Sequence, residues 1–218
     1  MKSTIIFTKK QSLGEEISNA VSHGVGAILS LVGIVILIIL SVKNANAFGV
    51  LSSIFYGSAL IILYSISTLY HSLTHPTAKK VFQILDHCSI FLLISGTYAP
   101  ISVMMIGGKI GYGLLIVNTT CAIVGIVLNA INIKKFKTIS MIFYVIMGWM
   151  CLFTIKPLVE SAPPNTLWLL VLGGVSYTVG IIFYKIKKLK YMHFIWHLFV
   201  LLGSILHFIF VLIGCFIY

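Results

Sequence analysis

Three histidines in two apolar stretches of this chain could together bind a metal ion. His193 and His197 are four residues apart at the start of one apolar run, and His71 closes another. Residues i and i+4 lie one above the other on a helix face, so the first two imidazoles can reach one ion. With a third nitrogen from His71, they would form the three-ligand pattern of a catalytic zinc, whose fourth position stays open. Histidine in or near a membrane span is costly and marks a candidate functional site.

Two oxygen-bearing side chains could complete such a site. Asp86 opens a further apolar run, where its carboxylate could bind the metal directly or accept a proton from water. The alternative is a first-turn acid that complements the helix dipole. Ser67 lies one turn before His71 and could orient a water or a substrate oxygen; alternatively, it bonds a carbonyl one turn back. Because the H-x-x-x-H motif lacks the glutamate of HExxH proteases, Asp86 is the candidate base.

The other histidines are weaker candidates. His207 lies about 15 Å deeper in the membrane than the H-x-x-x-H pair, so it cannot share their ion. We expect it to line a cavity or to bond a neighbouring helix. His87 points about 100° away from the preceding aspartate. His23 and His75 lie at helix ends or in a loop, where we expect solvated or interfacial rings.

Composition identifies a polytopic membrane protein. Of the 218 residues, 59% are hydrophobic and 9% are charged, and the mean hydropathy is +1.10, whereas soluble domains hold about 25% charged residues. The net charge of +11 comes from lysine alone, which indicates membrane topology rather than nucleic-acid binding.

The four cysteines form no C-x-x-C pair, so we expect neither disulfides nor a thiolate metal site. We also expect no cleaved signal peptide. Beyond the aspartate, the acids are expected in tails and loops: Glu15, Glu16 and Glu160.

A membrane span needs about 20 apolar residues, and stretches of this kind recur between the charged residues. They predict an all-α membrane protein, a bundle of seven transmembrane helices. The spans are expected near residues 20–42, 47–70, 84–106, 110–131, 139–155, 166–184 and 193–217. Residues 1–16 are expected to form a cytoplasmic tail, and residues 17–218 a single seven-helix domain.

The lysines predict the orientation of this bundle. Twelve of them fall in the N-terminal tail and in the loops after the second, fourth and sixth spans, and three fall on the other side: Lys43, Lys109 and Lys156. Because positive charge in short loops stays inside, the N-terminus is expected in the cytoplasm and the C-terminus outside. The histidines and the aspartate then share one depth on the cytoplasmic side. This predicts that the second, third and seventh helices pack around one point.

These same residues carry a family resemblance. S-x-x-x-H closes the second span, D-H opens the third, G-T-Y-A-P lies within it, and H-x-x-W-H opens the seventh. This order resembles the hemolysin III family, the bacterial branch of the progestin and adipoQ (adiponectin) receptor superfamily. The resemblance extends over nearly the whole chain.

The resemblance implies a zinc ion near the cytoplasmic side of a bacterial plasma membrane. It implies His71, His193 and His197 as the zinc ligands, Asp86 as the holder of the zinc-bound water, and Ser67 as its neighbour. The family is also grouped with membrane ceramidases, which implies hydrolysis of a lipid amide. Its name implies a lytic activity.

Three functions follow as hypotheses. The first is a zinc-dependent hydrolase that acts on a lipid amide or ester, with an acyl chain entering the bundle from the membrane. The second is a receptor-like or regulatory protein with structural zinc, which direct ligation by Asp86 would favour. The third is a lytic or pore-forming protein, which predicts polar residues through the full membrane depth. The chain offers few of these.

Overall fold

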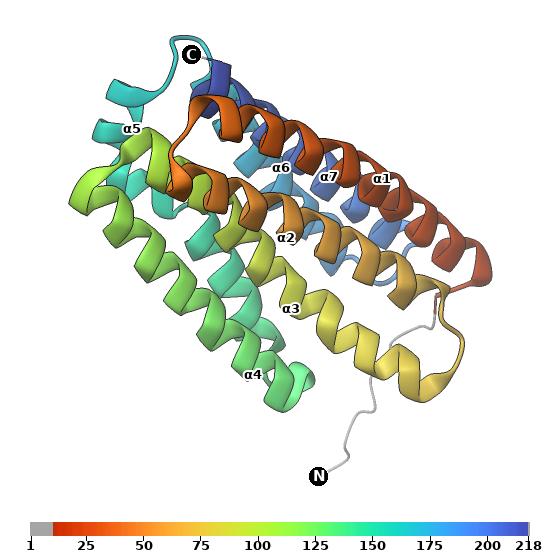
Figure 1. Cartoon of the computed structure of the whole chain (residues 1–218). Coiled ribbons are helices and arrows are strands. Elements are labelled where there is room, and N and C mark those ends of the chain that lie inside the picture. The colour runs from red at the N-terminus through yellow and green to blue at the C-terminus, as the bar shows by residue number, and fades with distance from the viewer. Residues whose placement is uncertain (1–10, 218) are drawn as a thin grey trace.

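The computed structural model describes residues 11–217, and all regular structure in that range is helical. Most of the predicted tail lies outside the described residues, and so do Lys2, Lys9 and Lys10. The elements, shown in Figure 1, are α1 (Leu13–Asn44), α2 (Ala47–Ser72), α3 (Pro76–Pro100), the π-helical η1 (Ile101–Ile106), α4 (Gly108–Gly148), the 3-10 helix η2 (Met150–Thr154), α5 (Ile155–Ser161), α6 (Leu167–Lys185), α7 (Met192–Leu212) and the π-helical η3 (Ile213–Ile217).

Local capping signals explain where the first helices begin. At the start of α1, the side chain of Ser12 accepts the backbone N–H of Glu15, whose carboxylate accepts the N–H of Ser12. This capping box starts the helix at Leu13. Glu15 and Glu16 therefore lie in the first helical turn, and the prediction that places them in a tail is wrong. Proline at the first position of α3 fixes a helical φ at that start.

The distribution of side chains on α1 is that of a membrane helix. Its buried face consists mostly of small or polar residues: Asn19, Ser22, His23, Gly26, Ser30, Gly33, Leu37 and Ser41. Large apolar residues such as Ile28 and Val32 are exposed. Small residues let helices approach closely, and Gly26 accordingly lies against the ring of Tyr64 in α2. Apolar side chains that face outward are expected where lipid is the solvent.

In the described residues, six helical segments are long and apolar enough to cross a membrane. One of them extends from Gly108 to Ser161 and contains the predicted fourth and fifth spans. It is broken at Asn132, whose φ and ψ of −162° and 90° are not helical, and Figure 1 shows the chain reversing direction there. Its two halves are linked by a hydrogen bond of 2.6 Å from the Ser140 hydroxyl to Oδ1 of Asn129.

The predicted packing of the second, third and seventh helices around one point is met only in part, because α7 makes few close backbone contacts with α2 or α3. α1 packs against both α2 and α7, α3 packs against α2 and α4, and α6 packs against α7. The first helix is therefore a neighbour of the two helices that carry the histidines, which the prediction did not include. One end of the bundle contains the start of α1, the end of α2, the starts of α3 and α7 and the break in α4. We call this end the histidine end.

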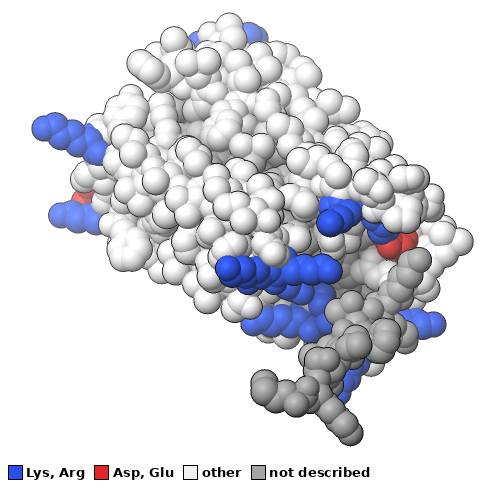
Figure 2. Space-filling model, turned by 90° about the horizontal axis from the view of Figure 1, so that it is seen from below, with Lys and Arg blue, Asp and Glu red and all other residues white. Residues whose placement is uncertain are grey.

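The histidine end is also the basic end of the described molecule. Nine lysines lie on its helix ends and loops: Lys79, Lys80, Lys134, Lys135, Lys137, Lys185, Lys187, Lys188 and Lys190. Figure 2 shows most of the visible lysine side chains gathered toward one end of the surface, with a few toward the opposite end, whereas the flanks between them are almost free of charge. This asymmetry is typical of a protein fixed in a membrane with one orientation.

Candidate metal centre

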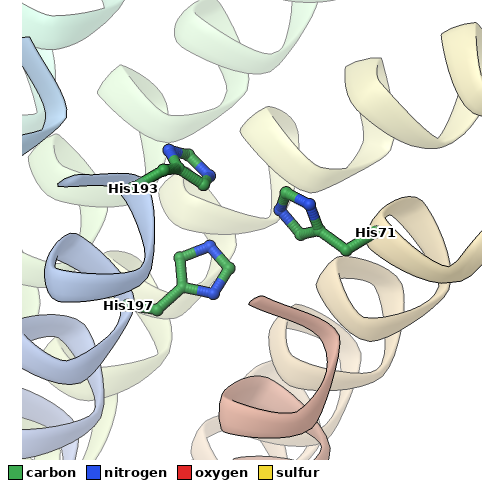
Figure 3. A group of neighbouring side chains, drawn as sticks. All are labelled: His71, His193 and His197. Carbon is green, nitrogen blue, oxygen red and sulfur yellow. The ribbon is translucent and has the colours of Figure 1, made fainter. Parts of the chain in front are cut away.

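The three histidines singled out by their spacing meet at one point in the structure. His71 comes from the last turn of α2, and His193 and His197 come from the first two turns of α7, with their rings facing one another (Figure 3). One ligand atom from each lies within 4.8 Å of the others. Zn–N bonds of about 2.0–2.1 Å would require these atoms to lie somewhat closer together. Among the described residues, this cluster can hold a metal ion through three imidazoles.

Helix α1 supplies hydrogen-bond partners to two of these rings. Oε2 of Glu16 lies 2.7 Å from Nδ1 of His71, and its Oε1 accepts from Nζ of Lys79 at 2.7 Å. The backbone carbonyl of Asn19 lies 3.2 Å from Nδ1 of His197. Both oxygens can only accept, so each Nδ1 donates, and a neutral ring then carries its lone pair on Nε2. Such outer partners orient the rings of metal-binding histidines.

The residues present fit a zinc ion. Nε2 of His71 is buried and has no hydrogen-bond partner, and a buried polar atom without a partner is costly. His71 and His197 are 4% and 2% exposed, so water cannot readily solvate them. An ion bound to the free lone pairs would remove this cost. Three imidazoles are a ligand set that zinc accepts, although copper, iron and nickel bind imidazole as well.

Ser67 and Asp86 lie beside the histidines without joining the cluster. Together with His23, His193 and His197 they line one cavity, which we call the inner cavity. The hydroxyl of Ser67 is buried and unpartnered, and its predicted alternative bond to a backbone carbonyl is not formed. Oδ2 of Asp86 lies 3.2 Å from Nδ1 of His87. The carboxylate lies in the third turn of α3, so it is not the first-turn acid that the alternative required.

His23 is the functional candidate that sequence reasoning missed. It is 3% exposed, and the prediction of a solvated or interfacial ring is wrong. Its ring stacks on that of His197 with a centroid separation of 3.6 Å and an interplanar angle of 11°. Neither of its nitrogens has a partner. The signal that could have revealed it is the spacing of Asn19 and His23, which places both on the buried face of α1.

The remaining histidines have local roles. Nε2 of His207 donates to the carbonyl of Leu170 on α6 at 3.0 Å, which confirms the predicted bond to a neighbouring helix. His75 is the N-cap of α3 and is exposed, as predicted. Nδ1 of His87 also lies 2.9 Å from the carbonyl of Gln83, one turn back in its own helix.

Two further cavities adjoin the inner cavity. An apolar cavity of about 100 Å³ shares six residues with it and extends along α3 and α6 to His207. The shared residues are Leu63, Ile90, Tyr144, Ile181, Trp196 and Val200. At the histidine end, a basin of about 410 Å³ is partly open and lined by lysines, and His71 and His193 form part of its floor. The candidate metal centre therefore lies between a polar opening and an apolar interior.

Comparison with known proteins places these observations in a family. The sequence profile of the family described as "Haemolysin-III related" matches residues 11–208. The chain is 45% identical to "Hemolysin-3" of Bacillus cereus over 93% of its own length and 92% of that protein. It is 40% identical to the "Hemolysin-3 homolog" of Bacillus subtilis, over 94% and 96% of the two chains. A more distant similarity, 27% over 70% of the chain and 66% of the relative, connects it to the human "Monocyte to macrophage differentiation factor".

Proposed function

This chain is a multi-pass membrane protein that belongs to the haemolysin III family, and from this premise we propose that it is a zinc-dependent hydrolase of a lipid amide or ester. The zinc ion would be held by His71, His193 and His197. The family match, the Bacillus relatives and the apolar helices support a bacterial cell membrane as its location.

One observation carries the proposal. Two of the three cluster histidines, His193 and His197, line the same cavity as a carboxylate and an unpartnered hydroxyl, and that cavity adjoins an apolar one. A hydrolase needs a base, a group that stabilises developing charge, and a place for the substrate. A purely structural metal needs none of these. The apolar cavity has room for the few methylene groups next to the reacting bond, so the rest of an acyl chain would extend between helices into the membrane.

The chain's own residues then take the following roles. Glu16 and the carbonyl of Asn19 keep two of the ligand rings oriented. Asp86 binds His87 through Oδ2, which leaves Oδ1 to accept a proton from the attacking water. The hydroxyl of Ser67 can donate to the carbonyl oxygen of the substrate. When bound, zinc supplies a Lewis acid and lowers the pKa of water toward about 7.

The receptor-like alternative, with structural zinc, is disfavoured by the position of Asp86. A structural site normally closes all four positions with protein ligands. In the described residues, the cluster that could hold an ion contains three histidines and no carboxylate. The names of the Bacillus relatives suggest lysis as another alternative, but the continuation of the inner cavity into an apolar one favours a lipid ligand over an aqueous pore.

We further propose that the protein crosses the membrane seven times, with the N-terminus in the cytoplasm. The break at Asn132 supports two crossings in the long segment from Gly108 to Ser161. The lysine-rich histidine end would face the cytoplasm. In a variant without native cysteines, Lys156→Cys should react with an impermeant maleimide on intact cells. Lys188→Cys should react only after the cells are opened, and the reverse pattern would contradict the orientation.

Metal analysis and hydrolysis measured on the same preparations test the reaction. We expect purified wild-type protein to hold about one zinc ion per chain, as a three-histidine site does. His197→Ala should lose the metal, whereas His207→Gln, a change in the same helix away from the cluster, should retain it. Asp86→Ala should keep the metal and lose cleavage of fluorescent lipid amides and esters. Wild-type protein without metal, or an Asp86→Ala variant with full activity, would overturn the proposal.

A further inference from the structure

The basin at the histidine end has an unusual charge balance. Its wall includes the histidines His71 and His193, and its four lysines outnumber its two acids: Lys79, Lys137, Lys187 and Lys190 against Glu15 and Glu16. A volume of about 410 Å³ is enough for a lipid head group with its first shell of water. The basin is therefore the natural place for the polar end of an amphiphilic ligand.

Only one of these four lysines, Lys79, forms an ion pair with a carboxylate within the described residues. Glu15 belongs to the cap of α1 and accepts the backbone N–H of Tyr191 at 3.0 Å. Glu16 binds His71 and Lys79. Of the remaining two acids, Asp86 lies against His87, and Glu160 lies in α5.

Lys137 and Lys187 consequently form no ion pair within the described residues, although they converge on one ring. Nζ of Lys187 lies 3.9 Å from the ring centre of Tyr184, and Nζ of Lys137 lies 5.3 Å from it. They come from separate segments, the second half of α4 and the loop between α6 and α7. Two cations that converge without a counter-charge repel each other, so an anion between them would be stabilised.

The protonation of Lys187 reflects this crowding. Desolvation of its ammonium group, together with the charge of Lys137, lowers the pKa of Lys187 to about 8. A bound anion would oppose both effects, because it favours the charged form of each lysine. Lys137 and Lys187 thus form a pair of cations without an anionic partner among the described residues.

The basin also adjoins the inner cavity beside the candidate metal centre. Four residues line both of them: His87, Lys137, Tyr184 and His193. The inner cavity in turn adjoins the apolar one, with which it shares six lining residues. An extended amphiphile could place its head in the basin, its middle at the histidines and its tail in the apolar cavity.

We propose that Lys137 and Lys187 bind the anionic head group of the lipid on which the histidine centre acts, with Tyr184 packed against both side chains. This inference rests on the proposed hydrolase and names its substrate class: a lipid with a phosphate-type head and an amide or ester bond between head and tail. The recognising chemistry is that of an oxyanion held by two ammonium groups. A free phosphate ion offers the same chemistry, and the test must separate the two.

The test measures binding rather than turnover. Native mass spectrometry of the full-length, zinc-loaded protein gives dissociation constants for dioctanoyl-phosphatidylglycerol and for dioctanoyl-phosphatidylcholine. We expect the wild type to prefer the anionic lipid. The double variant Lys137→Gln/Lys187→Gln should bind it about ten- to thirtyfold more weakly, as expected for two lysines at an anionic head group. The matched control Lys134→Gln/Lys188→Gln changes two exposed lysines in the same segments and should weaken binding by less than about threefold.

Each other outcome is equally decisive. Equal weakening by the two double variants would mean a general effect of positive charge and would overturn the site. If inorganic phosphate displaces the anionic lipid at equal concentration, the site binds the free ion. This result would overturn the proposal that a lipid head group is its ligand. Hydrolysis is recorded separately on the same samples. If the wild type hydrolyses lipids but does not prefer the anionic head group, this inference alone is rejected. If it prefers the anionic head group but does not hydrolyse lipids, the proposed reaction is rejected.

Discussion

Glu16 and His71 are 55 positions apart in the chain, yet Oε2 of the carboxylate lies 2.7 Å from Nδ1 of the imidazole. The same carboxylate accepts from Lys79 of α3 through its other oxygen. One side chain of α1 therefore links the helices α2 and α3 at the depth of the metal ligands. Two residues of α1, Glu16 and Asn19, lie within hydrogen-bond distance of two of the three rings, so this helix belongs to the candidate metal centre.

Removal of the Glu16 carboxylate should weaken metal binding. We expect Glu16→Ala to raise the zinc dissociation constant by about 10- to 100-fold, the range found for outer-shell partners of ligand histidines. Competition with a fluorescent chelator measures this constant. Glu15→Ala is the matched control, because the neighbouring acid caps α1 and touches none of the ligands. Similar zinc affinities in the two variants would show that the bond to His71 does not support the site.

His23 should matter for activity more than for stability. His23→Phe keeps an aromatic ring beside His197 and removes two buried nitrogens that lack partners, so the melting temperature should stay equal or rise. Because these nitrogens belong to a ring that lines the inner cavity, we expect slower cleavage of lipid substrates at unchanged metal content. Unchanged turnover would restrict this histidine to a packing role.

Neighbouring glycines of α6 provide a sharp test of how α6 packs against α7. A side chain at Gly173 would collide with the ring of His207, whereas one at Gly174 would make ordinary contact with Trp149. We expect Gly173→Ala to destabilise the protein by about 1–3 kcal/mol, the usual cost of overpacking. Gly174→Ala should be close to neutral. Thermal unfolding in detergent compares the two, and equal melting temperatures would contradict this helix contact.

Metal removal should affect the histidine end most. A chelator would leave Nε2 of His71 buried without a partner, which is unfavourable. We expect faster hydrogen exchange at the end of α2 and the start of α7 after treatment with a chelator, and restored protection when zinc returns. The end of α6 that contains Leu167, at the opposite side of the bundle, serves as the internal reference. Uniform exchange before and after treatment would argue against a bound ion.

Much of the fold followed from local patterns, but its exceptions are instructive. Apolar runs predicted the membrane helices because burial in lipid depends on composition over one span. The capping box at Ser12 was present in the sequence, yet the acids beside it suggested a tail and the helix start was placed too late. The packing of α1 against α7 depends on contacts between distant residues, for which a single sequence carries no direct signal.

The sequence by itself determined that His193 and His197 share one helix face, because the period of the α-helix leaves no other arrangement. It also determined the apolar character of the helices and the basic character of one end. Only the tertiary structure decided that Glu16, Asn19 and His23 surround these ligands, and that Lys137 and Lys187 meet at Tyr184. Helical periodicity is fixed by neighbouring residues, whereas these meetings depend on how separate helices pack, and that is set by the whole bundle.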